Sequence, residues 1–442
     1  MGFIKSIEII KFRGIQKLEV SGFSNINLIV GDNNSGKTTF LEAIQLLFAK
    51  PYVSSIKNVI NHRTLLKPNS SFYTSFIKMF NKEQDKDFYE FDIYALSDNG
   101  TLEFELNGRE KIVSGEEGLQ LATMSISQKF EYKSTTMVMP ETAKVFTGSI
   151  ITQTGKKSIE KEIRCTSLDK PFSGPIVKKE VYYIPSFGHL RYDLLKNIVD
   201  NPEYKKLSID ILRQFDNSIA DICYTKADDG TYLESIITND GSNMPFSVYG
   251  DGIKKILYIL NKLFDAADSI LLIDEIETGL HKKYYDLLFP VIFALANKLN
   301  VQLFIATHSI EAIDAILRYG NYENNYADND PIKVITLKKV DDNNGVQPDI
   351  RRFIAGSRIR GMAQQFQRIQ RVSAAFLLHA PGAQESGILP KGTDLSICHI
   401  DHRLVACSSR VRRSCSEKCL RLLQKWQSMS ISCSSSMMET SS

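Results

Sequence analysis

One glycine-rich segment has the residue types and spacing of a phosphate-binding loop. Residues 31–38 read Gly-Asp-Asn-Asn-Ser-Gly-Lys-Thr, with the second glycine followed directly by a lysine and a threonine. Glycines let backbone N–H groups close around phosphate oxygens, and the N-terminus of a following helix adds a positive field. Lys37 should then reach the β- and γ-phosphates, and Thr38 should offer its hydroxyl to Mg²⁺. We therefore expect ATP and Mg²⁺ as cofactors.

The segments on either side of this loop are those that a nucleotide-binding turn requires. Residues 25–30 indicate a short buried strand, and residues 38–48 indicate a helix with one apolar face. A chance lysine in a strand–helix turn is the alternative, and the presence of both elements disfavours it. The residues of the loop predicted to bind nucleotide are Gly31, Asn33, Asn34, Ser35, Gly36, Lys37, Thr38 and Thr39.

Two carboxylates follow an apolar strand at residues 269–273. Asp274 and Glu275 would stand at the carboxyl end of that strand, where parallel α/β sheets bind their ligands. We expect Asp274 to hold Mg²⁺ through water, and Glu275 to orient and deprotonate the attacking water. An acidic helix cap is the alternative interpretation of this pair. The phosphate loop upstream favours the catalytic one.

His308 follows the next apolar strand, at residues 301–306. A lone histidine more often caps or packs than acts in chemistry. This one, however, would lie at the same sheet edge as Asp274 and Glu275, which favours a sensor that hydrogen-bonds the γ-phosphate. Glu275 and His308 are thus the predicted catalytic residues.

The rest of the chain supplies the elements that must position these groups. Short strands alternate with turns over the first fifty residues, and residues 87–181 are mostly β-like, with a hairpin predicted at Asp98-Asn99-Gly100. Helices return from Arg191, and Asp229-Gly230 indicates another hairpin. The two apolar strands and the helix between them form a βαβ pattern. The expected fold class is α/β.

The motifs, taken in order over residues 1–340, resemble those of the ABC-type ATPase head shared by SMC, RecF and OLD-family proteins. The matching segments are Phe12-Arg13-Gly14, the Walker A loop 31–38, the signature position Tyr249-Gly250-Asp251-Gly252, the Walker B pair Asp274-Glu275, the D-loop-like Glu277–His281, and the switch histidine His308. The resemblance implies a P-loop NTPase fold with a β-rich first lobe and a helical second lobe.

The resemblance also implies a mechanism. Two heads would dimerise face to face, with each ATP held between the Walker A loop of one copy and the signature of the other. Gly250, Asp251 and Gly252 would offer backbone N–H groups at a helix N-terminus, and Arg13 would contact phosphate. ATP binding would close the dimer, and hydrolysis at Glu275 would reopen it.

Three features of the sequence narrow this expectation. Gly250 stands where transporters carry the signature serine, so that hydroxyl contact is absent. The glutamine that usually lies near the metal is not marked by a clear motif, and Gln153 and Gln128 are only guesses for it. No convincing Asp-x-Asp follows residue 340, so we expect a stand-alone ATPase without the Toprim nuclease domain of OLD proteins, and similar ATPases often work beside a separate nuclease or effector.

Composition divides the chain near residue 347. We expect an ATPase head over residues 1–347, with a β-rich lobe at about 51–185 and a helical lobe at about 190–347, and a tail over residues 348–442. The tail has 14 Lys/Arg against 6 Asp/Glu, which leaves 40 against 45 before it. A nucleic-acid-binding extension and a zinc site are two interpretations of the tail; a poorly ordered, non-native segment is the one we favour. The zinc ligands would be Cys398, His402, Cys415 and Cys419.

Bulk properties fit an ordinary soluble protein with a net charge of +3. No run reaches the ~18 apolar residues that a membrane helix needs, and no signal peptide is evident, so we expect a cytoplasmic protein. Its predicted function is an ATP-hydrolysing switch that dimerises and controls an effector protein or a DNA transaction. An ATP-sensing module with little hydrolysis and a RecF-like DNA-binding repair ATPase are the alternatives.

Overall fold

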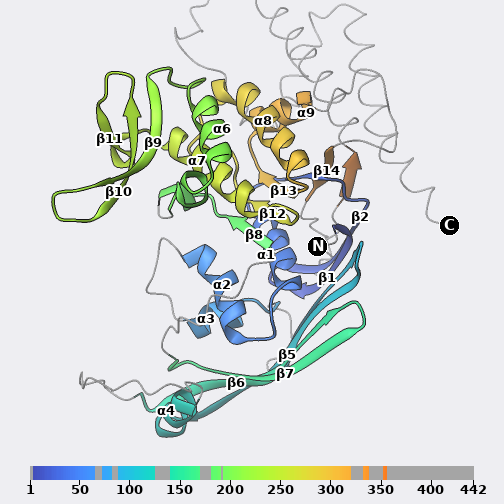
Figure 1. Cartoon of the computed structure of the whole chain (residues 1–442). Coiled ribbons are helices and arrows are strands. Elements are labelled where there is room, and N and C mark those ends of the chain that lie inside the picture. Colours follow the sequence, from blue (N-terminus) through green and yellow to red (C-terminus); the bar gives the residue numbers. More distant parts are fainter. Residues whose placement is uncertain are drawn as a thin grey trace, which may run out of the picture. The chain divides into compact units, whose positions relative to one another are not determined.

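The computed structural model describes residues 3–64, 72–81, 88–124, 140–169, 181–190, 193–319, 332–337 and 352–355. The chain divides into two compact units, residues 1–368 and 369–442, and the described residues all belong to the first (Figure 1). The zinc ligands predicted in the tail lie outside the described residues, and so does Gln128.

A six-stranded sheet, here called the parallel sheet, contains the strand that precedes the phosphate loop. Its strand order is β15-β14-β3-β13-β12-β8, and every neighbouring pair is parallel except β14 and β15. All residues of β3, β12 and β13 are buried, as expected for a parallel sheet covered on both faces. The strands are β3 (Ile26–Val30), β8 (Val181–Ile184), β12 (Ile270–Ile273), β13 (Gln302–Thr307), β14 (Ile332–Thr336) and β15 (Arg352–Ala355).

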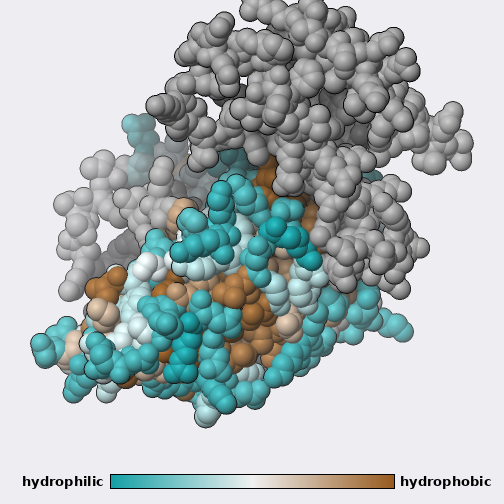
Figure 2. All heavy atoms as spheres, turned by 90° about the horizontal axis from the view of Figure 1, so that it is seen from above, coloured by the Kyte–Doolittle hydropathy of each residue, from teal (hydrophilic) through white to brown (hydrophobic). Residues whose placement is uncertain are grey.

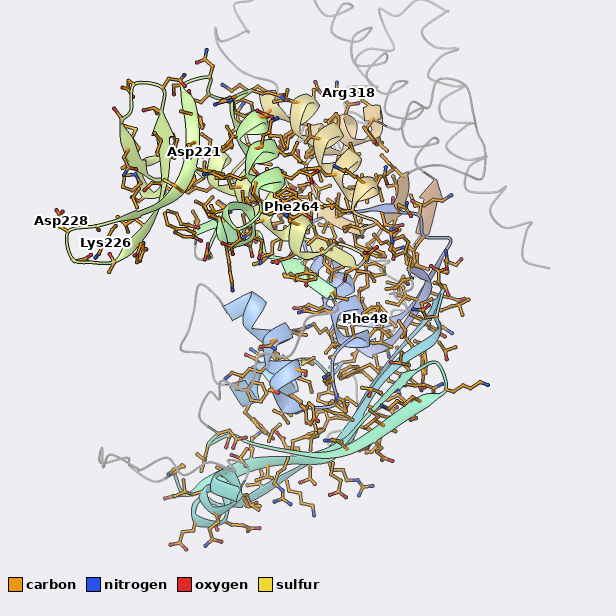
Figure 3. The ribbon with its side chains drawn as sticks, in the orientation of Figure 1. Phe48, Asp221, Lys226, Asp228, Phe264 and Arg318 are labelled. Atoms are coloured by element: carbon orange, nitrogen blue, oxygen red, sulfur yellow. The ribbon has the colours of Figure 1, made fainter. Side chains whose placement is uncertain are left out.

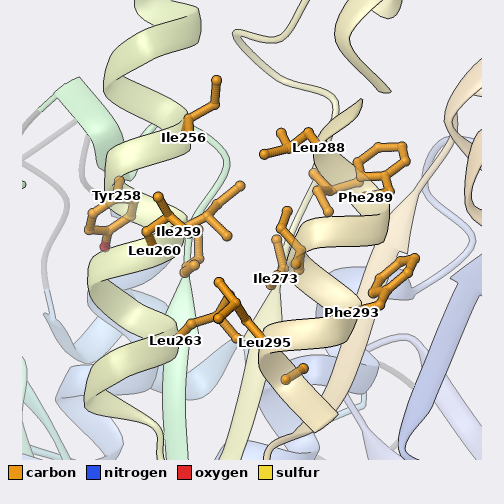
Figure 4. Close-up of a cluster of buried hydrophobic side chains, with 14 of the residues drawn as sticks. Ile256, Tyr258, Ile259, Leu260, Leu263, Ile273, Leu288, Phe289, Phe293 and Leu295 are labelled. Atoms are coloured by element: carbon orange, nitrogen blue, oxygen red, sulfur yellow. The ribbon is translucent and has the colours of Figure 1, made fainter. Parts of the chain in front are cut away.

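Alternate residues of the parallel sheet enter two different cores. Leu271 and Ile273 pack with the helices α7, α8 and α9, whereas Ile270 and Leu272 pack with α1 and the first sheet of the chain. Figure 4 shows Leu263 of α7 pointing toward Leu295 of α8 beside β12. Burying one such side chain stabilises the fold by about 1.5–3 kcal/mol. These helices are α1 (Lys37–Leu47), α7 (Asp251–Asp265), α8 (Tyr285–Lys298) and α9 (Ile310–Tyr319).

The second six-stranded sheet, here called the antiparallel sheet, holds the β-rich part of the chain. Its order is β2-β1-β4-β5-β6-β7, and all neighbours are antiparallel. The hairpin predicted at Asp98-Asn99 is confirmed, because Ser97 pairs with Gly100 across it. The strands are β1 (Ile4–Phe12), β2 (Ile15–Ser21), β4 (Tyr89–Ser97), β5 (Gly100–Ser114), β6 (Thr142–Thr154) and β7 (Lys157–Thr166).

Three helices accompany the antiparallel sheet. They are α2 (Val53–Thr64), α3 (Phe72–Ile77) and α4 (Gly115–Met124). The helix α4 interrupts a stretch whose sequence indicated mostly strands. It begins directly after β5, and acidic Glu116 and Glu117 occupy its first turn, where the helix dipole favours negative charge.

The helical part of the chain also carries a small antiparallel sheet. Its strands are β9 (Ile219–Lys226), β10 (Tyr232–Thr238) and β11 (Asn243–Pro245). The hairpin predicted at Asp229-Gly230 joins β9 to β10, and Figure 3 shows Asp228 at its tip. Two helices, α5 (Lys196–Val199) and α6 (Pro202–Leu212), precede this sheet, and Tyr204 stacks on Phe264 of α7 with ring centroids 3.9 Å apart.

The P-loop α/β architecture expected from the sequence is confirmed. A phosphate-type loop connects β3 to α1, and the strand that carries the two acids, β12, is parallel to β3 and separated from it by β13 alone. Hydrophilic side chains surround a more hydrophobic central area on the face shown in Figure 2. None of the described helices combines the length and the apolar character needed to cross a membrane.

Candidate functional site

The phosphate loop has a backbone that its residue types make possible. Gly31, Asn34 and Gly36 have φ values of 153°, 66° and 97°, all in the region that glycine and, less often, asparagine adopt. A Cβ atom on Gly31 would lie 2.2 Å from the carbonyl oxygen of Leu337. The loop is therefore held tightly against the segment that follows β14, and its first glycine cannot carry a side chain without movement.

The side chain of Lys37 folds back over this loop and contacts its first two residues. Its Nζ donates hydrogen bonds to the carbonyl oxygens of Gly31 (2.8 Å) and Asp32 (2.9 Å), and the residue is only 8% exposed. Burial lowers the pKa of Lys37, and the negative charges of Asp274 and Glu275 act in the opposite direction. The ammonium group thus lies within the field of the acids at the end of β12, as a shared site requires.

A direct hydrogen bond joins the loop to the predicted metal ligand. Thr38 Oγ1 donates to Asp274 Oδ2 over 2.9 Å, although the two residues are 236 positions apart in the sequence. Tyr183, on the adjacent strand β8, donates its hydroxyl to the same oxygen over 3.0 Å. Parallel pairing of β12 with β8 and with β13 brings these groups to one edge of the sheet.

The chemistry of this pair fits Mg²⁺. Asp274 Oδ1 is buried and has no hydrogen-bond partner, and the hydroxyl of Thr38 lies beside the same carboxylate. Both are hard oxygen ligands of the kind Mg²⁺ prefers, and Mg²⁺ in nucleotide sites takes only one or two protein ligands besides water and phosphate. Among the described residues, no cluster of three or more His, Cys, Asp or Glu that could hold a metal occurs.

The electrostatics of Asp274 point the same way. Burial raises the pKa of Asp274, while the hydrogen bonds from Thr38 and Tyr183 lower it. A buried carboxylate with one unpaired oxygen is costly on its own, and a divalent cation removes that cost. Thr38 and Asp274 would therefore be the protein ligands of the ion.

Glu275 has a strained backbone. Its φ is 48°, in the left-handed region that a glutamate seldom adopts, and Thr278 Oγ1 donates to its Oε2 over 3.2 Å. Strain of this kind persists where the surrounding structure imposes it, which is common at functional sites. The turn gives Glu275 a half-buried side chain directly beyond the end of β12.

His308 lies beyond the end of β13 and contacts a residue for which we predicted no catalytic role. Its backbone N–H donates to Glu277 Oε1 over 3.0 Å, and its ring Nδ1 lies 3.1 Å from the same oxygen. The His308 side chain is 44% exposed and that of Glu277 only 10% exposed. The D-loop-like match had included Glu277 without indicating this contact.

Arg13 lies beside the helix of the phosphate loop. Its Nε is 2.8 Å from Oε2 of Glu42, a fully buried residue of α1, and its own φ is 53°. The structure thus places Arg13 in an ion pair next to the loop; its contact with phosphate stays a prediction. Neither Glu42 nor Tyr183 carried any signal in the sequence, because both occupy apolar-looking elements.

The signature residues Gly250, Asp251 and Gly252 stand at the N-terminus of α7. A Cβ on Gly252 would lie 3.4 Å from the carbonyl oxygen of Gly279, in the segment after Glu275. The structure therefore places the signature turn beside that segment, and its contact with nucleotide of a second copy stays a prediction. Gln153 lies in β6, where its amide donates to the Gly155 carbonyl over 2.9 Å.

Comparison with known proteins agrees with this geometry. A family model described as "AAA domain" matches residues 6–243, and a second, described as "AAA domain, putative AbiEii toxin, Type IV TA system", matches residues 178–314. An ATP/GTP phosphatase of Helicobacter pylori is 27% identical over 342 residues, covering 72% of this chain and 90% of that protein.

More distant similarity extends to RecF proteins and SMC head domains. RecF, the DNA replication and repair protein of Bacillus thuringiensis, is 25% identical over 213 residues, which are 47% of this chain and 48% of RecF. The SMC head domain of Thermotoga maritima aligns with a TM-score of 0.35 at 10% identity, over 80% of this chain and 98% of that one. An Smc head bound to the C-terminal domain of ScpA, from Pyrococcus furiosus, gives 0.42 at 10% identity, over 83% and 100%.

The two family models and the ATP/GTP phosphatase relative agree with the ATPase head predicted from the order of the motifs. The loop, the two acids and the histidine all follow the carboxyl ends of strands in one parallel sheet, and their roles in ATP hydrolysis stay predictions. The model described as "AAA domain" matches more than half of the 442 residues of this chain. The chain therefore belongs to the AAA domain family.

Proposed function

We propose that this protein is an ATP-hydrolysing switch that dimerises on ATP. The observation that carries the proposal is the hydrogen bond between Thr38 and Asp274, which unites the phosphate loop with the end of β12 around an unpaired carboxylate oxygen. A loop that only bound phosphate would have no need of that second group. With it, the site has the parts of a Mg²⁺-dependent phosphoryl-transfer centre.

Each residue has a defined task in this proposal. The backbone N–H groups of residues 31–37 and the Lys37 ammonium bind the phosphates, with the positive end of α1 behind them. Mg²⁺, when bound, neutralises charge that develops on the phosphate oxygens. Glu275 orients a water molecule and accepts its proton, and His308 hydrogen-bonds the γ-phosphate from the neighbouring strand end.

Dimerisation supplies the groups that one copy lacks. Gly250, Asp251 and Gly252 offer N–H groups at the start of the fifteen-residue helix α7, and Gly250 and Asp251 are exposed. In a face-to-face dimer they would cover the γ-phosphate bound by the other copy. ATP would then close the dimer, and hydrolysis would release it.

The test is phosphate release by the purified full chain together with ATP binding. Lys37→Ala should weaken ATP binding by about 100-fold or more, because a buried charge–phosphate contact is lost. Glu275→Gln should bind ATP normally, lose about 10²–10⁴-fold in hydrolysis, and accumulate as a dimer in size-exclusion chromatography with ATP. ATP binding by Lys37→Ala equal to wild type, or full turnover by Glu275→Gln, would overturn the assignment.

DNA is a proposed partner, because RecF is named for DNA replication and repair. Residues 1–347 carry 40 Lys/Arg against 45 Asp/Glu, so binding would need a local basic surface. Titration of the full chain with duplex DNA, with and without ATP, at about 50 and about 200 mM salt would reveal a salt-dependent complex. Absence of binding at the lower salt would instead leave a protein effector as the proposed partner.

A further inference from the structure

Glu277 makes three polar contacts with the segment that begins at His308. Its Oε1 accepts hydrogen bonds from the backbone N–H groups of His308 (3.0 Å) and Ser309 (3.2 Å) and lies 3.1 Å from His308 Nδ1. One carboxylate oxygen therefore holds both the backbone and the ring of the histidine. These contacts bridge the ends of two neighbouring strands, β12 and β13.

The local structure makes this anchoring rigid. The Glu277 side chain is 10% exposed, and it leaves the sheet two residues after the strained Glu275. Ser309 is fixed in turn, because its Oγ accepts from Ala312 N–H over 3.1 Å at the start of α9. The histidine is thus placed between a buried carboxylate and the first turn of a helix, with little freedom to change its ring orientation.

A ring held in this way presents a defined atom to a ligand. When Nδ1 carries the proton donated to Glu277, Nε2 is the ring nitrogen that stays available for another partner. Carboxylates that orient a histidine through Nδ1 are a general means of fixing tautomer and direction. Glu277 Oε2 itself is buried and has no hydrogen-bond partner, so the contacts of this carboxylate with the His308 segment are all made by Oε1.

We propose that Glu277 is a positioning residue that holds His308 Nδ1 and thereby directs Nε2 toward the γ-phosphate of ATP. This inference rests on the proposed function, since it needs His308 to act on bound ATP. In this proposal the Glu277 carboxylate does not touch ATP; it affects catalysis only by orienting His308. Its removal should therefore lower the rate of hydrolysis without weakening ATP binding.

The experiment is a double-mutant cycle on the full chain, with kcat and KM for ATP hydrolysis measured alongside thermal unfolding. Glu277→Ala and His308→Ala should each lower kcat by about 10-fold or more, with KM changed less than about 2-fold. The double variant should be no slower than the slower single variant, because both changes disable the same histidine. Glu277→Gln, which keeps an oxygen acceptor, should recover part of the rate.

Glu311 offers a matched control. It is another carboxylate near the same turn, where its Oε2 accepts from Ser309 Oγ over 3.2 Å and its side chain is exposed. Glu311→Ala should leave kcat within about 2-fold of wild type. Comparable losses in Glu277→Ala and Glu311→Ala would show that the loss is not specific to the carboxylate that contacts His308 Nδ1, and would overturn the inference.

Two further outcomes would also overturn it, namely losses that multiply in the double variant or a Glu277→Ala protein with wild-type kcat. If Glu277→Ala unfolds, the cycle is run with Glu277→Gln instead. Failure of the proposed function is distinct, because wild type would then release no phosphate, or Glu275→Gln would match it. In that case the inference fails with its premise. When wild type is active and Glu275→Gln is inactive, the kinetics of the Glu277 variants test the positioning role alone.

Discussion

The parallel and antiparallel sheets of this protein have six strands each and yet satisfy their polar groups differently. In the antiparallel sheet the strands are long, and β5 and β6 pair without interruption over thirteen residues each. Within the described ranges, no strand residue of that sheet has a buried side-chain nitrogen or oxygen that lacks a hydrogen-bond partner. At the carboxyl edge of the parallel sheet, by contrast, Ser35 Oγ, Asp274 Oδ1 and Glu277 Oε2 are all buried and unpaired.

We interpret this difference as one of role: the antiparallel sheet stabilises the fold, and the carboxyl edge of the parallel sheet binds a ligand. A buried polar atom without a partner costs about 1–3 kcal/mol, and a fold dominated by packing avoids it. Three such atoms lie beyond the ends of β3 and β12, and Glu275 beside them has a left-handed backbone. Together they indicate that this edge of the sheet is arranged to bind a ligand. We therefore expect the strands of the antiparallel sheet to contribute to stability rather than to catalysis.

The strongest test of this division is a cavity in the antiparallel sheet. Phe104 of β5 is fully buried and stacks on Phe91 with ring centroids 6.0 Å apart. Phe104→Ala should lower the free energy of unfolding by about 3–5 kcal/mol, measured by urea denaturation, while kcat per folded molecule stays unchanged. Glu160→Gln on exposed β7 is the control, expected within about 0.5 kcal/mol of wild type. A large fall in kcat for Phe104→Ala would contradict the division.

Asp274→Asn should have the next largest effect, with opposite signs on activity and stability. The amide oxygen can still accept from Thr38 and Tyr183, but the charge that holds Mg²⁺ is lost, so hydrolysis should fall by about 100-fold or more. Without Mg²⁺ the variant should unfold at a higher temperature than wild type at about pH 7, because no buried charge has to be kept.

Asp274 should also make the stability of the protein depend on pH. Because its pKa is raised in the folded state above the ordinary value of 3.8, the folded protein binds the proton more tightly than the unfolded chain. Wild type should therefore lose stability, relative to Asp274→Asn, as pH rises from about 3.8 through the raised pKa. Denaturant midpoints of both proteins across this range, without metal, provide the measurement. If the difference between the two midpoints did not change with pH, burial would not destabilise the charged form of the Asp274 carboxylate.

Gly31→Ala should have a smaller but definite effect. The added Cβ would meet the Leu337 carbonyl oxygen, and a φ of 153° is unfavourable for alanine. We expect a loss of roughly 1–3 kcal/mol in unfolding free energy, together with weaker ATP binding because the loop must move. Gly14→Ala is the control for stability, since no heavy atom lies within 4 Å of its added Cβ. Equal midpoints for the two variants would show that the loop yields easily.

The sequence allowed the local parts of this site to be predicted, and the reason is physical. The phosphate loop and the Asp274-Glu275 pair are runs of adjacent residues. Their glycines, lysine and acids occur at a spacing that can be recognised directly in the sequence. The partners of these residues are not adjacent: Tyr183 is 91 positions from Asp274, and Glu277 is 31 positions from His308. Such pairs depend on strand order, and local patterns do not determine that β8 lies beside β12.

Packing helices were likewise easier to predict than irregular insertions. The apolar stripe of residues 253–264 predicted α7 closely, whereas α4 was missed within a stretch of strands. The buried pair of Arg13 and Glu42 was also missed, since a glutamate in a helix usually faces water. In each case tertiary contacts outweighed local preference.

One buried amide links the two sheets. Gln302 of β13 is 1% exposed; its Oε1 accepts from the Ile4 N–H over 2.9 Å, and its Nε2 donates to the carbonyl oxygens of Ile4 (3.0 Å) and Ser24 (3.1 Å). Sliding one sheet past the other would break the two bonds to Ile4 in a buried region, at a cost of about 1–3 kcal/mol for each polar group left without a partner. We therefore expect a displacement of β13, the strand that leads to His308, to be transmitted to β1, the first strand of the chain.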